Sequence, residues 1–372
     1  MKTHGHGQAR STVTEFRNLV FEGGGVWGIA YEGVLSELER LDGIDFDGLL
    51  RVGGASAGAI TACLLAVGYG PQELGRVLRD TSFSKFKDDD LGFARDTARL
   101  LTEYGWYKGD EFRRWIRKLI RTRIRQLSAE AGVQPPAGRP TFAQLADWQR
   151  SLAEKGRHLP ALYVVGSNLS RQRREIYSAE AAHTPSLHID DAVRRSMSIP
   201  LFFACARGQR RDVIVDGGLT WNYPVNLFDH RRYLSDPQRG RPVAYADDDD
   251  RVFNTETLGI RLDTTRELQL NLKDWANEPI EIDNIVKFGW ALAAFTRAVA
   301  NKIHLHKNDW SRTLFVDVGD SIGFTDFELS EEQKEFLVEA GREGARKYLR
   351  WCRSRSGQKE LERIYRDMAP SG

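Results

Sequence analysis

The sequence predicts an α/β fold in which a central, mostly parallel sheet is flanked by helices. Two consecutive units of strand, glycine-rich turn and helix support this prediction. In the first unit, the apolar strand 18–21 leads into a turn with four glycines, and apolar residues recur at helical spacing over 29–41. In the second unit, the strand 49–53 is followed by the apolar helix 57–67. Parallel strands need a crossover between them, so two such units within the first 70 residues indicate a parallel sheet.

Later segments extend this pattern along the 372-residue chain. Further strands are expected at 161–169, 212–215 and 257–262, and long helices at 280–306 and 331–353. We expect one α/β domain over residues 15–260. A mainly helical C-terminal extension, residues 261–372, is expected to pack on that domain or to cover its site.

The composition is that of a globular protein with a sizeable core, 41% hydrophobic and 28% charged. A net charge of +2 gives no overall bias toward nucleic acid, so no nucleic-acid partner is expected. Three isolated cysteines form neither a disulfide framework nor a metal-binding spacing, and we expect no metal and no cofactor. The polar N-terminus lacks the apolar core of a signal peptide, and no apolar run reaches the length of a membrane span. A cytoplasmic location is therefore expected.

A candidate nucleophile, Ser56, lies in the sequence Gly54-Ala-Ser56-Ala-Gly58. The G-x-S-x-G spacing is typical of a sharp strand-to-helix turn that exposes a serine hydroxyl. Side chains at positions 54 and 58 would collide with the strand and helix that meet there. Unpaired N–H groups at the start of the following helix favour developing negative charge. An ordinary tight turn would fit the same five residues, so this motif alone leaves both roles open.

The first glycine turn also permits two interpretations. Gly23, Gly25 and Gly28 have the G-x-G-x-x-G spacing of a dinucleotide-binding fingerprint, in the strand-then-helix context that such a site needs. A nucleotide site does not, however, explain a serine turn directly afterwards. Successive backbone N–H groups in a run of glycines also form an anion-binding nest, and beside a nucleophile a nest serves as an oxyanion hole.

Four separated segments together resemble the patatin-like phospholipases, a family of serine acyl hydrolases with a Ser–Asp dyad. The resemblance covers roughly residues 18–230, and the order and spacing of the segments are those of the family. The segments are Gly23–Gly28 after a strand, Gly54–Gly58, Arg195–Pro200 followed by Phe202-Phe203, and Asp216-Gly217-Gly218 with Asn222-Tyr223-Pro224.

The resemblance implies a three-layer fold and a role for each matching residue. Ser56 would be the nucleophile, Asp216 the general base, and Gly24 and Gly25 the source of oxyanion-hole N–H groups. The activity implied is hydrolysis of carboxylic esters in phospholipids or related lipids, of the phospholipase A type. Trp27 departs from the family, which usually has Arg or Lys at that position, so the resemblance does not extend to a headgroup preference.

The residues around Asp216 are consistent with this role. A serine hydroxyl needs a base within hydrogen-bond reach, and burial raises the basicity of a carboxylate. The strand 213–215 places Asp216 at a sheet edge, and Gly217 and Gly218 let the backbone bend so that the carboxylate turns toward the serine turn. By itself, Asp-Gly-Gly is equally a common turn sequence.

Two other functions remain open from the residues alone. One is an α/β-hydrolase esterase with a Ser-Asp-His triad, because His230, His304 and His306 follow Asp216 in the required order. The other is a catalytically silent ligand-binding module that keeps the fold.

Contact with a membrane surface, where a lipid substrate would be met, is expected to be peripheral. Residues 110–127 predict a basic amphipathic helix with Phe112, Trp115 and Ile116 on its apolar side. Such a helix can lie in a bilayer interface, with its apolar stripe among acyl chains and its cations near anionic headgroups. The same pattern also fits a helix that packs its apolar stripe on the protein core. The sequence does not predict an oligomeric state.

Overall fold

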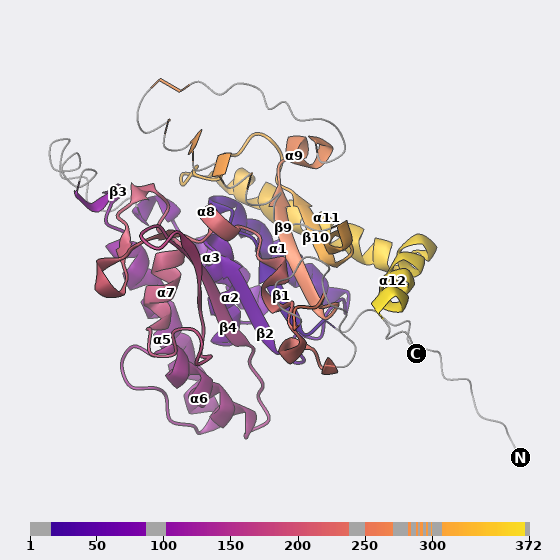
Figure 1. The fold of residues 1–372 in the computed structure, drawn as a ribbon, viewed down its shortest axis with the longest axis horizontal. Coiled ribbons are helices and arrows are strands. Elements are labelled where there is room, and N and C mark those ends of the chain that lie inside the picture. The colour runs from indigo at the N-terminus through magenta and orange to yellow at the C-terminus, as the bar shows by residue number, and fades with distance from the viewer. Residues whose placement is uncertain are drawn as a thin grey trace, which may run out of the picture.

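The computed structural model describes residues 16–86, 102–237, 250–270 and 307–368, together with scattered positions between 282 and 299. The helix expected at 280–306 therefore lies largely outside the described residues. The described chain folds around one central sheet with helices packed against it (Figure 1).

The sheet has eight strands in the described part of the chain, in the order β10-β9-β1-β2-β4-β8-β7, with β5 paired to β4. Strands β10, β9, β1, β2 and β4 run parallel, whereas β8 and β5 pair antiparallel with β4. A small parallel pair, β3 and β6, lies apart from this sheet. The strands are β1 (Asn18–Phe21), β2 (Arg51–Ala55), β3 (Gly105–Tyr107), β4 (Ala161–Asn168), β5 (Arg173–Tyr177), β6 (Leu201–Phe203), β7 (Ala206–Arg207), β8 (Val213–Asp216), β9 (Thr257–Asp263) and β10 (Thr313–Asp317).

The two faces of the sheet are covered differently. Side chains alternate between the faces of a strand, so in β1 Leu19 and Phe21 enter the main core while Val20 enters a smaller one. The main core contains helices α1, α2, α3, α5, α6, α7 and α11, and the smaller core contains α8 and residues 225–233. The α-helices are α1 (Ala30–Arg40), α2 (Ala57–Ala66), α3 (Pro71–Asp80), α5 (Asp110–Ala131), α6 (Phe142–Ala153), α7 (Ile189–Ser196), α8 (Gly218–Trp221), α9 (Thr265–Leu270), α11 (Glu331–Arg353) and α12 (Arg355–Met368).

This architecture confirms the predicted fold class, a mostly parallel sheet between helices with C-terminal helices added. The C-terminal region also contributes strands to the sheet. The boundary expected between residues 260 and 261 falls inside β9, and β10 continues the sheet beside it. Helix α11 then packs along α1, so a helix from the C-terminal region lies beside the first α-helix of the chain (Figure 1).

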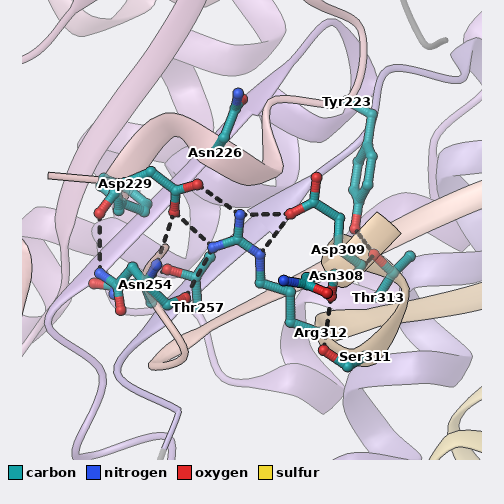
Figure 2. Close-up of polar contacts among 12 residues, drawn as sticks. Tyr223, Asn226, Asp229, Asn254, Thr257, Asn308, Asp309, Ser311, Arg312 and Thr313 are labelled. Atoms are coloured by element: carbon teal, nitrogen blue, oxygen red, sulfur yellow. Dashed lines mark hydrogen bonds and ion pairs between the residues drawn. The ribbon is translucent and has the colours of Figure 1, made fainter. Parts of the chain in front are cut away.

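A buried ion cluster links the start of β10 to the rest of the sheet (Figure 2). The Arg312 guanidinium donates to both carboxylate oxygens of Asp229, at 2.6 and 2.7 Å, and to Asp309 at 2.6 and 3.0 Å. It also donates to the Asn254 carbonyl at 2.8 Å. All three charged side chains are buried, so this cluster joins segments that are far apart in the sequence through charge-assisted hydrogen bonds.

Candidate active site

Ser56 lies at the turn between β2 and α2, where its backbone adopts φ 52° and ψ −124°. Positive φ is costly for a residue with a side chain, and surrounding contacts must hold it. The helix begins immediately after the turn, since the Ser56 carbonyl accepts from the Ala59 N–H at 2.9 Å. The side chain is buried.

The two flanking glycines pack against backbone. A Cβ at position 58 would lie 2.4 Å from the Phe21 carbonyl oxygen, and one at position 54 would lie 2.5 Å from backbone atoms of Gly58. Atoms do not approach this closely, so neither position has room for a side chain. The absence of side chains therefore lets α2 begin directly against the end of β1.

Two contacts from the end of α7 hold Ser56. Its N–H donates to the Ser196 hydroxyl oxygen at 2.9 Å, and its own hydroxyl donates to the Met197 sulfur at 3.4 Å. The second contact is weak, because a thioether is a poor acceptor. The Ser56 hydroxyl is thus oriented toward Met197 in this state.

Asp216 is the last residue of β8, on the other side of β4 from Ser56. In the sheet register Ala55 lies opposite Val165, and Asp216 lies opposite Gly166, so the two candidate residues are at the same level of the sheet. The Asp216 carboxylate is buried and accepts from the Gly218 N–H at 2.6 Å. The turn after β8 therefore bends back over the carboxylate.

The glycine turn after β1 lies against both of these segments. A Cβ at position 23 would be 3.0 Å from the Ser56 Cβ and 2.5 Å from the Asn222 side-chain oxygen. The Gly23 N–H donates to the Asn222 carbonyl at 3.0 Å, and the Asn222 amide donates to the buried Glu22 carboxylate at 2.8 Å. Asn222 therefore fixes the glycine turn beside the Asp216 turn. Gly28, further along, packs against Ala57.

Some of the backbone N–H groups in this glycine turn are hydrogen-bonded, and others have no acceptor within the described residues. The Gly23 N–H bonds Asn222, and the Val26 N–H donates to the Phe324 carbonyl at 3.0 Å. Within the described chain, the N–H groups of Gly24 and Gly25 have no hydrogen-bond acceptor. Gly25 has φ 56°, which turns successive amides toward one side, as in an anion-binding nest.

One small cavity brings the predicted residues together. Its volume is about 50 Å³, and its lining includes Gly23, Gly24, Gly25, Ser56, Asp216 and Gly218, with Asn222, Ile199 and Phe324 among the others. The lining does not include four other predicted motif glycines, Gly28, Gly54, Gly58 and Gly217. Pockets that bind drug-sized ligands have volumes of roughly 300–1,000 Å³, so the cavity in this state is too small for a lipid.

The segment 319–327, which follows β10, contributes Phe324 to the lining of the cavity. Phe324 lies over the glycine turn, and the Trp27 indole N–H donates to the Ile322 carbonyl at 2.8 Å. The Trp27 and Phe324 rings also meet edge to face, 6.0 Å apart. Trp27 is buried, so at the position where the family usually has a cation this chain has an anchor for its own C-terminal region.

The candidate histidines lie elsewhere or outside the described residues. His230 is in the segment next to Tyr233, whose carbonyl accepts from Arg51 at the start of β2, the end of the sheet opposite Ser56. His304 and His306 lie outside the described residues. No histidine of the described chain lines the small cavity.

The apolar stripe of α5 is part of the core. Phe112, Ile116 and Ile120 are buried, and Trp115 packs against Phe86. Of the two arrangements that the sequence left open for this stripe, the structure therefore shows packing on the core, because the stripe contacts other side chains. Arg117 is likewise engaged, with the buried Asp190 at 2.9 Å.

A larger cavity, of about 790 Å³, lies between β10, α11 and α12. Its lining combines aromatic side chains with carboxylates, among them Trp310, Phe315 and Glu339. It contains none of the predicted site residues. The candidate nucleophile, the candidate base and the glycine turn all line the small cavity instead.

Metal ligation and membrane spanning have no support in the described residues. They include no group of three or more His, Cys, Asp or Glu side chains placed to hold a metal ion. None of the helices found in them combines the length and the apolarity that a membrane-spanning segment needs.

The fold is a three-layer α/β arrangement, and one cavity gathers the candidate site residues. The family model of the patatin-like phospholipases matches residues 19–229, more than half of the chain. The chain therefore belongs to the patatin-like phospholipase family, a family of lipid hydrolases, and the resemblance predicted from its motifs is confirmed.

Two relatives extend the similarity beyond the family model. The chain is 26% identical over 330 residues to protein R571 of Acanthamoeba polyphaga mimivirus, covering 88% of this chain and 92% of that protein. It is 27% identical over 338 residues to YqhO of Bacillus subtilis, covering 89% and 97%. Both are described as uncharacterized. Coverage of this extent must include much of the region after residue 229.

Among solved structures, VipD from Legionella pneumophila is similar to this chain. The TM-score is 0.60 at 18% identity, over 91% of this chain and 67% of VipD. At this identity the likeness concerns the fold alone.

The sequence interpretation passed over three residues that contact the site. Ser196 and Asn222 lie within segments that carry the family resemblance, and this position in the sequence could have identified them as neighbours of the site. Phe324 has no local signal, because nothing in its neighbourhood indicates that it reaches a turn near the N-terminus.

Proposed function

We propose that this protein hydrolyses carboxylic esters of phospholipids or related lipids through an acyl-enzyme formed on Ser56. Asp216 would act as the general base, and the N–H groups of Gly24 and Gly25 as the oxyanion hole. The observation that carries the proposal is that one cavity is lined by Ser56, Asp216 and two glycines whose N–H groups have no acceptor within the described residues.

The proposed reaction has two steps. Asp216 takes the proton from the Ser56 hydroxyl as its oxygen attacks the ester carbonyl carbon, and the negative charge that develops on the carbonyl oxygen is stabilised by the two glycine N–H groups. The bond to the alcohol then breaks, and the departing oxygen takes the proton from Asp216. In the second step a water gives one proton to Asp216 as its oxygen attacks the acyl carbon. The bond between the acyl carbon and the Ser56 oxygen then breaks, and that oxygen takes the proton from Asp216, which frees the fatty acid and restores both residues.

This mechanism requires the Ser56 hydroxyl to rotate. In the present state it contacts the Met197 sulfur, a weak acceptor that a carboxylate can readily replace. A serine hydroxyl changes its direction by rotation about a single bond. No histidine is needed in this scheme, since one carboxylate serves both steps.

Variants at two aspartates, one just before β8 and one at its end, test whether Asp216 is the general base. Asp216→Asn, which keeps the shape of the side chain, should lower the kcat for a soluble short-chain p-nitrophenyl ester by about 10³-fold or more, because the proton acceptor is lost. Asp212→Asn is the control: Asp212 lies just before the same strand and pairs with Arg171, away from the cavity. Activity that survives in Asp216→Asn, or that is lost in His230→Ala with normal folding, would contradict the dyad.

A catalytically silent, ligand-binding protein is the other outcome of this experiment. If the wild-type protein releases no acyl group from any ester or lipid offered, the proposed reaction is wrong.

We further propose that the lipid is met at an anionic membrane surface through exposed cations of α5. Arg114, Lys118, Arg121 and Arg125 are exposed and recur at spacings of four, three and four residues, which places them on one side of the helix. An exposed row of cations attracts anionic headgroups, by about 1 kcal/mol for each cation near the surface.

A pair of charge reversals tests this contact. Changing Lys118 and Arg121 to Glu should weaken binding to vesicles with anionic lipid, and the binding of the wild-type protein should fall as salt rises. The matched control reverses Lys347 and Arg350 on α11, which are similarly exposed. Equal vesicle binding by the two double variants would contradict a specific role for α5.

A further inference from the structure

The hydroxyl of Ser196 lies in the gap between three elements of the site. Ser196 is the last residue of α7 and is fully buried. Its hydroxyl oxygen accepts from the Ser56 N–H at 2.9 Å, and the hydroxyl donates to the Val165 carbonyl of β4 at 2.6 Å. The direction of both bonds is fixed, since an N–H can only donate and a carbonyl can only accept.

The bond from Ser56 constrains the turn that holds the candidate nucleophile. Ser56 has positive φ, a conformation that persists only where neighbouring contacts hold it. Its N–H is buried at the end of β2 and would lose a hydrogen bond without the Ser196 oxygen. The Ser196 hydroxyl thus ties the strained turn to the central strand β4.

The backbone of Ser196 holds the other half of the site. Its carbonyl accepts from the Gly217 N–H at 3.2 Å, directly after Asp216. One residue therefore contacts the amide of Ser56 through its side chain and the Asp216 turn through its backbone. The separation between the two candidate catalytic residues depends on where Ser196 lies.

We propose that Ser196 is a positioning residue that sets the orientation of Ser56 relative to Asp216. The inference rests on the proposed function, since its effect is measured as reactivity at Ser56. It also removes one donor from the oxyanion hole, because the Ser56 N–H is used by Ser196, whereas the N–H groups of Gly24 and Gly25 stay available.

The expected effect of losing this hydroxyl is a loss of reactivity. A misplacement of a reacting group by about 1 Å can cost on the order of 100-fold in rate. For Ser196→Ala we therefore expect a fall of about 10- to 100-fold in kcat for a soluble short-chain ester, with KM changed by less than about threefold. The cavity lining that binds substrate stays in place, which is why KM should change little.

The matched control is Ser128→Ala. Ser128 is also buried, and its hydroxyl accepts one N–H from another helix, the Trp148 indole at 2.8 Å. Ser128 does not line the small cavity. If Ser196 has only a structural role, the two variants should lose similar thermal stability and keep similar activity.

The second readout is the labelling rate of Ser56 by a fluorophosphonate, measured by mass spectrometry of the intact protein with Ser56→Ala as the unlabelled reference. In this reaction the Ser56 oxygen bonds to phosphorus, fluoride leaves, and the serine proton passes to the base. Ser196→Ala should label about 10- to 100-fold more slowly than wild type, and Ser128→Ala should label within about threefold of wild type. Equal labelling rates in the two variants would overturn the proposal.

Further variants and outcomes keep the test decisive. If Ser196→Ala does not fold, Ser196→Cys replaces the hydroxyl with a weaker donor and acceptor, and wild-type labelling in a folded Ser196→Cys would overturn the proposal. If the wild type is labelled but hydrolyses no lipid, the proposed substrate class is wrong. The labelling rates of Ser196→Ala and Ser128→Ala would still decide whether Ser196 positions Ser56. A wild-type protein that neither labels nor hydrolyses an ester would overturn both proposals.

Discussion

Replacing Arg312 with Met should destabilise the protein strongly. The guanidinium is the cation between two buried carboxylates, Asp229 and Asp309, and it also bonds the Asn254 carbonyl (Figure 2). Met has a similar length and no charge. The variant would leave two carboxylates buried without their cation, at the junction between β10 and the rest of the sheet.

The size of the effect follows from the burial of the cluster. The exposed fractions of the three side chains are 3% for Arg312, 7% for Asp229 and 2% for Asp309, so water does not replace the lost bonds. Removing one partner of such a buried pair typically costs about 3–5 kcal/mol. A protein has only about 5–15 kcal/mol of stability in total, so the variant should lose a substantial fraction of it.

Urea denaturation at pH 7 measures this loss. The control is Arg350→Met, because Arg350 is 69% exposed in its pair with Glu343 and should contribute about 0–1 kcal/mol. Burial raises the pKa of Asp229, and Arg312 opposes that shift. Without Arg312 the folded variant would bind protons more readily than the unfolded chain, so its stability should recover as the pH falls from 7 toward 5. A loss below about 1 kcal/mol at pH 7 would refute this account of the cluster.

Two other predictions concern contacts of the C-terminal region. Hydrogen bonds from Arg40, with a further bond from Arg346 of α11, lower the pKa of Glu37 to about 2, although burial acts in the opposite direction. The ionised Glu37 therefore stabilises the folded protein fully above the ordinary pKa of glutamate, and this stabilisation is lost as the pH falls below that value. Glu37→Gln should therefore lower the free energy of unfolding by about 1–2 kcal/mol at pH 7, after allowance for the exposure of Arg40. Urea denaturation should show that the difference in stability between the wild type and this variant shrinks between pH 5 and pH 3. A difference that stays constant over this range would contradict the pairing. Trp27→Phe removes the hydrogen bond to the Ile322 carbonyl, which is worth about 1 kcal/mol, so the segment over the cavity should open more easily. The ratio of kcat/KM for a long-chain phospholipid to kcat/KM for a short-chain ester should then rise by up to about fivefold. An unchanged or lower ratio would mean that this segment does not limit lipid entry.

The serine turn and the glycine turn of the candidate site could be predicted because the sequence patterns that indicate them are local. Ser56 and the glycine turn each lie where a strand ends and a helix begins, and glycine, apolar spacing and strand ends are all visible in short stretches of sequence. Asp216 was expected near them at a sheet edge, but β8 runs antiparallel to β4, and Asp216 reaches the level of Ser56 because β8 ends opposite Gly166.

Other features depend on contacts between distant segments, which no short stretch of sequence reveals. Phe324 reaches the glycine turn from almost the other end of the chain, and Ser196 meets Ser56 only because α7 ends beside β2. The apolar stripe of α5 has the same pattern whether it faces a bilayer or the core, so periodicity could not decide between them. The boundary predicted at 260 separated the α/β domain from the helices expected after it, whereas β9 crosses this boundary as part of the sheet.

The most direct test of the central claim compares wild-type protein with Ser56→Ala on a total lipid extract. After incubation, mass spectrometry measures free fatty acids and lysolipids. Hydrolysis at Ser56 predicts that the wild type releases both products, and that Ser56→Ala, folded to the same extent, releases neither above background. Equal product release by the two proteins would contradict the claim that Ser56 is the nucleophile, and no release by either would contradict lipid hydrolysis itself.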